Sequence, residues 1–267
     1  MRYKIKPIKQ LGQNFLIDKQ IIKKVIRTAN LQSRDIVLEI GPGTGALTQE
    51  IAKTAKRVIA VEKDPNMCEI LKQSLKDFKN VKIVNQDILK VNLAYLNKLS
   101  LLSKNYKLIA SLPFYIATPV IRKFLESKNP PKEMILIIQK EVAQRICAKP
   151  PEMSILTVSV QFYADVKIVS YISKKSFRPS PKVDSAIITI IPKRKYKNVD
   201  LGLFFKIVKA GFAHPRKQLL NNLANELKLN KQKISDLLLK NKIKSFQRAE
   251  ALSIKDWVNL FNSIHKS

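Results

Sequence analysis

The sequence predicts an α/β protein with a mostly parallel sheet, an antiparallel edge and a small all-helical domain at its C-terminal end. Five short apolar runs alternate with segments of helical spacing, which is the pattern of parallel strands joined by crossover helices. Beyond the charged segment 192–200, the remaining apolar periodicity is helical only. A chain of 267 residues is long enough for one large domain and one small one.

The expected parallel strands come first in the chain. They are DIVLEI (35–40), RVIAVE (57–62), VKIVN (81–85), KLIAS (107–111) and MILIIQ (134–139). Two later extended stretches, 166–172 and 185–192, follow each other without a long helix between them, and therefore suit an antiparallel pair at the sheet edge.

The rest of the chain predicts helices. FFKIVKAGFA (204–213) and RKQLLNNLANEL (216–227) have helical spacing of their apolar residues. We therefore expect one domain over residues 1–192 and a second, helical domain over 200–267, joined by a charged linker.

Basic residues dominate the composition. The chain has 50 Lys and Arg against 20 Asp and Glu, a formal net charge of +30. Residues 193–267 contain 17 basic and 5 acidic side chains, so both expected domains are basic. Such a surface attracts polyanions, and we expect nucleic acid as the partner, bound through its phosphates more than through its bases. A general lysine enrichment in the source organism would give the same composition and stays an alternative.

Several classes of protein are disfavoured. No apolar run approaches the roughly 18 residues of a membrane span, and the charged start has no apolar stretch after it, so we expect a cytoplasmic protein without a membrane partner. Cys68 and Cys147 lie far apart, and His214 and His265 are the only histidines. We therefore expect no metal site.

A glycine-rich turn follows the first expected strand. In EIGPGTGALT the glycines include Gly41 and Gly43, which allow a tight turn and the close approach of a ligand to the backbone. The third glycine is one position too early for G-x-G-x-x-G, and Glu39 would repel an anionic pyrophosphate, which disfavours a nicotinamide dehydrogenase. A ligand that bears an amino group and a sulfonium suits this turn better.

Acidic residues stand at the ends of the next two strands. Glu62 ends the second strand, where an acid accepts hydrogen bonds from ribose hydroxyls. Asp87 follows the third strand, well placed for an adenine amino group, although a helix-capping role is an equal alternative for this residue. With Glu39, these acids predict an adenosyl pocket.

Eight segments, in order along nearly the whole chain, resemble the ribosomal RNA small-subunit adenine N6,N6-dimethyltransferase family. They are LGQNFL (11–16), EIGPGTGALT (39–48), VEKD (61–64), NQD (85–87), LPFYIATP (112–119), QKEVAQR (139–145), FRPSPKVDSA (177–186) and PRKQLLNNL (215–223). The resemblance implies a Rossmann-like methyltransferase fold with S-adenosylmethionine as cofactor. It also implies a monomer that dimethylates N6 of two adjacent adenosines near the 3′ end of small-subunit rRNA, in an assembling 30S-type particle. The implied cofactor contacts are Asn14, Leu16, Glu39, Gly41, Gly43, Glu62, Asp87 and Ser111.

The fourth expected strand ends in the motif SLPF, which we expect to be catalytic. A side-chain acceptor at Ser111 and the Leu112 carbonyl would hold the two N6 hydrogens of an adenine, whose nitrogen is a poor nucleophile. Pro113 would fix the turn, and Phe114 would offer a face for a flipped-out base, worth roughly 1–3 kcal/mol. The alternative is a buried strand that ends in a proline turn, with the phenylalanine in the core.

One position of this motif and the position directly after it depart from the family, which usually has asparagine at both. Ser111 is shorter than asparagine and can donate as well as accept, so the second acceptor is less firmly defined. Tyr115 is the other departure. We expect these changes to affect the rate and the second methylation rather than the fold.

A second recognition element is expected in the proline-stiffened loop FRPSPKVDSA. The resemblance implies that Phe177 lines the other side of the target base and that Lys182 meets phosphate. A core position for Phe177 is the alternative, since most phenylalanines are in cores.

Two other functions remain open at this point. One is the methylation of large-subunit rRNA by a related class of enzymes that confers antibiotic resistance. The other is a non-catalytic RNA-binding assembly factor on the same fold. The non-catalytic alternative is disfavoured because the pocket residues Glu39, Gly41, Glu62 and Asp87 are all present. The only support for this alternative is Ser111.

Overall fold

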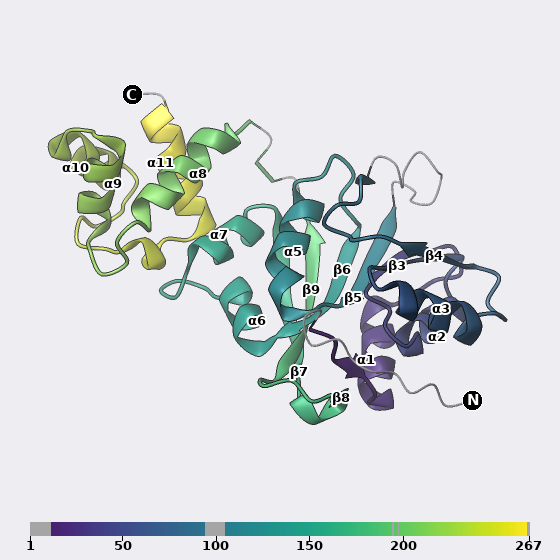
Figure 1. The fold of residues 1–267 in the computed structure, drawn as a ribbon. Coiled ribbons are helices and arrows are strands. Elements are labelled where there is room, and N and C mark those ends of the chain that lie inside the picture. Colours follow the sequence, from purple (N-terminus) through teal and green to yellow (C-terminus); the bar gives the residue numbers. More distant parts are fainter. Residues whose placement is uncertain (1–11, 94–104, 194, 197, 266–267) are drawn as a thin grey trace. The chain divides into compact units, whose positions relative to one another are not determined.

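The computed structural model describes residues 12–93, 105–193, 195–196 and 198–265, and is shown in Figure 1. The chain forms two compact units. One comprises the residues up to Ala143 together with Asp165–Pro192, and the other comprises Gln144–Ala164 and Lys193–Ser267. Among the described residues, no helix is both long and apolar enough to cross a membrane.

The first unit is built on a seven-stranded sheet with the order β4-β3-β2-β5-β6-β9-β7. The first five strands are mutually parallel, and β9 runs antiparallel to β6. The expected mostly parallel sheet is therefore confirmed, as is the pairing of the last two strands at its edge. The strands are β2 (Ile36–Ile40), β3 (Arg57–Glu62), β4 (Val81–Asn85), β5 (Tyr106–Ser111), β6 (Glu133–Gln139), β7 (Ala164–Ile172) and β9 (Ser185–Pro192).

Helices connect these strands. Asp18 caps the first of them by accepting hydrogen bonds from two backbone N–H groups, and Asp64 caps the third, which has proline at its first position. The helices are α1 (Lys19–Ala29), α2 (Ala46–Ala52), α3 (Pro65–Ser74), α5 (Ala117–Leu125) and α6 (Lys140–Cys147).

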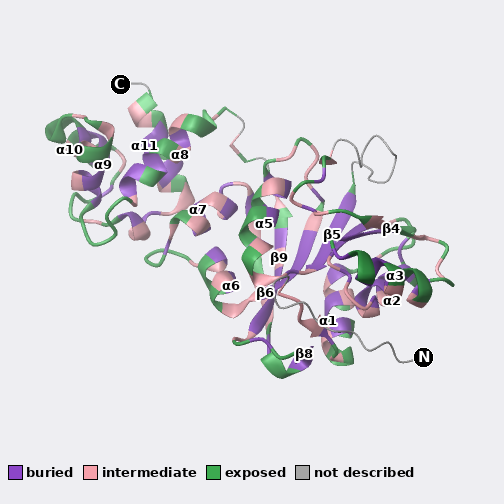
Figure 2. Ribbon diagram, viewed as in Figure 1, coloured by how far each residue is buried: buried purple, intermediate pink, exposed green. Residues whose placement is uncertain are grey.

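One face of the sheet carries α1 and α2. Ile22 and Val25 of α1 and Ile51 of α2 pack in one cluster with sheet residues such as Val37 and Ile109. The cluster is part of the buried interior in Figure 2. Alternate residues of a strand share a face, and the register places Glu39, Glu62 and Ser111 on this same face, beyond the apolar cluster.

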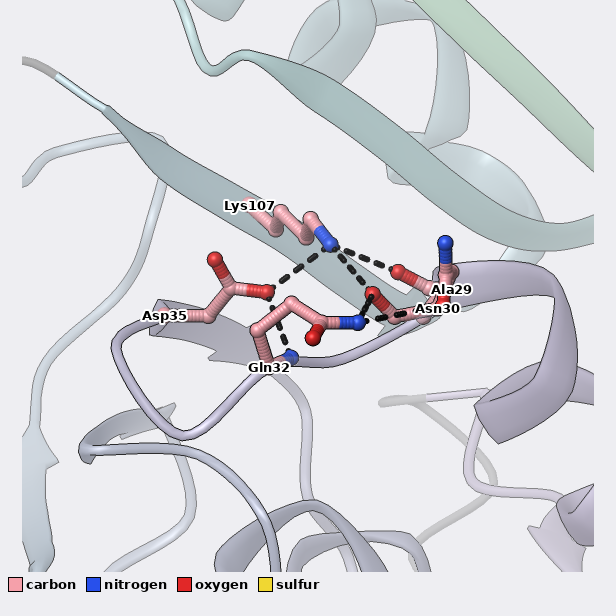
Figure 3. Close-up of polar contacts among 5 residues, drawn as sticks. All are labelled: Ala29, Asn30, Gln32, Asp35 and Lys107. Atoms are coloured by element: carbon pink, nitrogen blue, oxygen red, sulfur yellow. Dashed lines mark hydrogen bonds and ion pairs between the residues drawn. The ribbon is translucent and has the colours of Figure 1, made fainter.

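A buried lysine joins β5 to the end of α1 and the start of β2 (Figure 3). Lys107 Nζ donates to the carbonyls of Ala29 at 2.7 Å and Asn30 at 3.0 Å, and lies 2.8 Å from Asp35 Oδ2. All three partners are oxygens, so the ammonium group has three acceptors for its three donors. The pKa of Asp35 is subject to an upward effect of burial, but its hydrogen bonds with Lys107 and with the Gln32 backbone hold it below its usual value.

The second unit is helical and differs from expectation in its boundary. Residues 144–164, expected in the first domain, belong here, because Met153, Val158 and Phe162 pack into the same apolar cluster as Phe204 and Trp257. A domain boundary at residue 192 is therefore wrong for this segment. Its helices are α7 (Ile155–Gln161), α8 (Leu201–Gly211), α9 (Leu219–Leu227), α10 (Lys231–Lys240) and α11 (Ile254–His265).

The start of α9 also differs from expectation. The helix begins at Leu219, and Arg216 and Lys217 lie in the exposed turn before it rather than in its first turn. The Leu219 N–H donates to the Gln247 carbonyl at 2.8 Å, which fixes where this turn ends.

Candidate functional site

The strand order reverses direction between β2 and β5, and a pocket lies at the carboxyl ends of these strands. In open α/β sheets this reversal leaves a crevice where ligands bind. Its walls come from the turns after β2, β3, β4 and β5, from the N-terminal segment and from residues near the short strand β8 (Phe177–Arg178). The lining includes Gln13, Asn14, Gly41, Gly43, Glu62, Lys63, Asp87, Ser111, Leu112, Pro113, Phe114, Phe177 and Ser185.

The glycine turn after β2 brings backbone to the pocket. Gly41 and Gly43 have φ of +65° and +56°, in the region that favours glycine. A Cβ at position 43 would lie 2.9 Å from Phe15 Cδ1, so the N-terminal segment approaches this turn closely. A Cβ at position 41 would lie 3.8 Å from the Ser111 carbonyl oxygen, which shows how near the ends of β2 and β5 are.

Glu39 is a buried carboxyl group beside the pocket. The residue is 1% exposed and lines a smaller adjoining cavity with Asn14, Leu16 and Gly41. Burial raises its pKa to about 8, the Thr48 hydroxyl opposes that shift, and the negative charge of Glu62 adds to it. Among the described residues, however, neither the Thr48 hydroxyl nor Glu39 Oε2 has a hydrogen-bond partner of good geometry. A buried, unpartnered carboxylate oxygen fits a cationic group of a ligand.

Glu62 ends β3 and faces the same pocket. It is 8% exposed, and its Oε1 accepts a hydrogen bond from the Asp64 N–H at 2.9 Å. Burial raises its pKa, although backbone N–H groups of Asp64, Gly43 and Lys63 partly oppose the shift. Gln13 Nε2 donates to Asp64 Oδ2 at 2.9 Å, which links the N-terminal segment to this strand end.

Asp87 lies two residues beyond β4, in a tight turn. Its Oδ1 accepts from the Leu89 N–H at 3.0 Å, and its Oδ2 lies 3.0 Å from Lys63 Nζ. Burial acts to raise the pKa of Asp87, but these two partners hold it below its usual value. The carboxylate therefore caps a turn and not a helix, and the same residue lines the pocket.

The SLPF motif forms the turn between β5 and α5. The Leu112 N–H donates to the Ile137 carbonyl at 3.0 Å, and Pro113 has φ −53° and ψ 139°. Phe114 begins a short 3-10 helix, is partly exposed and lines the pocket, so it does not belong to the buried core. The exposed Tyr115 lines the same pocket.

The N-terminal segment pairs with the recognition loop, which follows it by 161 residues at the pair Leu16 and Phe177. β1 (Phe15–Leu16) and β8 (Phe177–Arg178) form a two-stranded antiparallel ladder in which Leu16 is opposite Phe177. Phe177 is 6% exposed, packs in the core cluster and also lines the pocket, so the two expected positions are not exclusive. Lys182 is exposed.

The structure brings the expected site residues together. All of the expected catalytic residues line the pocket, as do the expected cofactor contacts except Leu16 and Glu39, which line the adjoining cavity. Leu11 of the first motif lies outside the described residues. Lys63, Gln13 and Ser185 also line the pocket and were not singled out by the sequence, although each belongs to one of the quoted motifs. The side-chain partners of Lys63 and Gln13 come from other strand ends, so no local pattern could have identified them.

Comparison with known sequences gives a consistent result. The family described as ribosomal RNA adenine dimethylase matches residues 5–266. A protein of Clostridioides difficile (strain 630) named ribosomal RNA small subunit methyltransferase A is 43% identical over 268 aligned positions, which cover 99% of this chain and 93% of that protein. A protein of the same name from Geobacillus kaustophilus (strain HTA426) is 39% identical, with 98% of this chain and 92% of the relative covered.

Solved structures agree. A dimethyladenosine transferase from Plasmodium falciparum superimposes with a TM-score of 0.79 at 28% identity, over 94% of this chain and 98% of that chain. The 23S rRNA methyltransferase ErmE superimposes with a TM-score of 0.76 over 94% and 100% of the two chains, and at 24% identity this is a similarity of fold. The expected Rossmann-like methyltransferase fold is confirmed, and the chain belongs to the ribosomal RNA adenine dimethylase family.

Proposed function

We propose that this chain transfers methyl groups from S-adenosylmethionine to N6 of two adjacent adenosines near the 3′ end of small-subunit rRNA, during assembly of the subunit. The observation that carries this proposal is the meeting of two buried carboxyl groups with the SLPF turn. Glu62 lines the same pocket as this turn, and Glu39 lines the cavity that adjoins it. Relatives named small subunit methyltransferase A, at 39–43% identity over almost the full chain, support the choice of subunit.

The residues of the pocket fit an adenosyl cofactor. S-adenosylmethionine supplies an activated methyl group on a sulfonium. The unpartnered Oε2 of Glu39 suits the cationic methionyl part, and Glu62 Oε2 suits the ribose hydroxyls because Oε1 already accepts from the Asp64 N–H. Asp87 would accept a hydrogen bond from the adenine amino group while its Oδ2 keeps the ion pair with Lys63.

The target base would lie between the SLPF turn and the recognition loop. Phe114 and Phe177 line the pocket from these two elements and offer faces for a flipped-out adenine. The Ser111 hydroxyl and the Leu112 carbonyl would accept the N6 hydrogens, which directs the nitrogen lone pair at the methyl carbon. S-adenosylmethionine would supply the methyl group as its S–C bond breaks, and the proton that N6 gives up would leave to solvent. The rate enhancement then comes mainly from positioning, since the sulfonium is already a good leaving group.

The charge of the chain fits a large RNA partner. A net charge of +30 favours the phosphate backbone, and the exposed Lys182, Arg216 and Lys217 are candidate contacts. The chain would act as a monomer on an assembling 30S-type particle in the cytoplasm.

A methyl-transfer assay tests the proposal. Purified protein would be incubated with tritiated S-adenosylmethionine and with unmethylated small or large subunits, and modified adenosines would be mapped. We expect dimethyladenosine at two adjacent positions of small-subunit rRNA, and much less product from a Glu62→Ala control at the same limiting cofactor concentration. Label in large-subunit rRNA would assign the other target class, and no label in either would favour a non-catalytic assembly factor.

A further inference from the structure

The ammonium group of Lys123, in α5, donates hydrogen bonds to the backbone of the pocket loop that carries Asp87. Its Nζ donates to the Leu89 carbonyl at 2.8 Å and to the Val91 carbonyl at 2.7 Å. Residues 86–89 of this loop line the pocket, whereas Lys123 itself does not. Two charge-assisted hydrogen bonds of this length are stronger than neutral ones and fix the loop to the helix.

The loop is held from both sides. The Asp87 carboxylate accepts from the Leu89 N–H at 3.0 Å, and the Asp87 carbonyl accepts from the N–H groups of Lys90 at 2.9 Å and Val91 at 3.0 Å. These contacts within the loop set its shape. Lys123 is different, because it comes from another element and sets where the loop lies.

The helix that carries Lys123 begins at the catalytic turn. α5 starts at Ala117, directly after the 3-10 helix Phe114–Ile116. The lysine therefore links the two parts of the pocket that our proposal assigns to the cofactor adenine and to the target base.

The negative charge of Asp87 favours the protonated form of Lys123. Burial lowers the pKa of Lys123, and the negative charge of Asp87 opposes that shift. Lys63 contacts Asp87 from another strand end, so Asp87 lies in the field of two ammonium groups.

We propose that Lys123 is a positioning residue that holds the adenine-binding loop 86–91 at a fixed distance from the SLPF turn, and so contributes to cofactor affinity without touching the cofactor. The inference rests on the proposed cofactor pocket. A lysine that served only to stabilise the fold would lower the free energy of unfolding and leave the affinity of the folded protein unchanged.

Calorimetric binding of S-adenosylhomocysteine tests the proposal. We expect Lys123→Met to raise the dissociation constant about 10-fold, equal to about 1.4 kcal/mol, and Lys123→Arg to restore it to within about 3-fold of wild type. The same fold-change is expected for 5′-methylthioadenosine, which keeps the adenine and ribose but lacks the amino-acid part. Arg122→Met is the matched control, because Arg122 is exposed on the same helix and forms a local ion pair with Glu126, at 2.7 Å.

Each outcome has one meaning. Failure of the wild-type protein to bind S-adenosylhomocysteine would contradict the proposed pocket itself. Normal binding by wild type, with an unchanged dissociation constant for Lys123→Met shown by circular dichroism to be folded, would overturn only the role of Lys123. If neither Lys123→Met nor Lys123→Arg folds, the lysine serves stability alone, and the proposal is again overturned.

Discussion

Glu39→Gln should make the free energy of unfolding less dependent on pH and should remove a proton release that accompanies cofactor binding. Glu39 is 1% exposed, and burial raises its pKa from the usual 4.5 to about 8. Because the folded-state pKa is the higher one, the folded protein binds this proton more tightly. The resulting stability is complete below pH 4.5 and is lost as the pH rises to about 8.

The magnitude follows from the two pKa values. At pH 7 the unfolded state has lost this proton and most folded molecules retain it, so relative to acid pH about 3 kcal/mol of stability is lost. Glutamine keeps the shape of the side chain but does not titrate. The difference in unfolding free energy between wild type and Glu39→Gln should therefore change by about 3 kcal/mol between roughly pH 4.5 and 7, in favour of the variant at the higher pH.

The raised pKa of Glu39 also predicts that cofactor binding releases a proton. A bound cationic group next to Glu39 favours the ionised carboxylate, so binding near pH 7 should release close to one proton, and affinity should rise with pH up to about 8. Calorimetry of S-adenosylmethionine binding in phosphate and in Tris buffer measures this number, and urea unfolding at several pH values measures the stability. An equal proton release in wild type and Glu39→Gln would refute the argument, as would parallel stability curves.

Three further predictions concern Ser111, Glu62 and Lys107. Ser111→Ala should lower turnover about 10- to 100-fold with little change in cofactor affinity, and Ser111→Asn should keep or raise turnover. Mass spectrometry of the target RNA measures this and also resolves the second methylation. Formation of dimethyladenosine by Ser111→Ala at the wild-type rate would contradict the prediction. Glu62→Ala should weaken cofactor binding by about 1.5–3 kcal/mol by calorimetry, and unchanged affinity in a folded variant would exclude the ribose contact. Lys107→Met should lower the free energy of unfolding by about 3 kcal/mol in urea, because it leaves the partly buried carboxylate of Asp35 without its cation. Adding Asp35→Asn should recover part of the loss.

The β1–β8 ladder is where sequence reasoning was weakest. From its residues alone, LGQNFL reads as a turn before a helix, and only the family resemblance gave it a function. The structure pairs Leu16 with Phe177 and brings Phe15 against the glycine turn. A two-residue strand has no periodicity to detect, and its partner is 161 residues away at the pair Leu16 and Phe177, so the pairing exists only in the folded chain.

The domain boundary was misplaced for a related reason. Residues 144–164 continue from α6 without a glycine-rich break, and their apolar spacing does not say which core they join. Phe162 shows that this segment belongs to the helical unit, because its ring packs against the rings of Phe204 and Tyr196. Membership of a core depends on which surfaces meet, and that is a tertiary property.

The sequence by itself determined the parallel sheet, because apolar runs of strand length separated by helical spacing have few other solutions. It also determined which side chains stand at the carboxyl ends of the strands, where parallel topology brings Glu39, Glu62 and Ser111 to one edge. Only the tertiary structure decided how these groups are charged and held. The raised pKa of Glu39, the contact of Lys63 with Asp87 and the attachment of Lys123 to the Leu89 carbonyl depend on burial and on partners from other elements. Those are properties of distance and solvent exclusion, which a linear pattern does not contain.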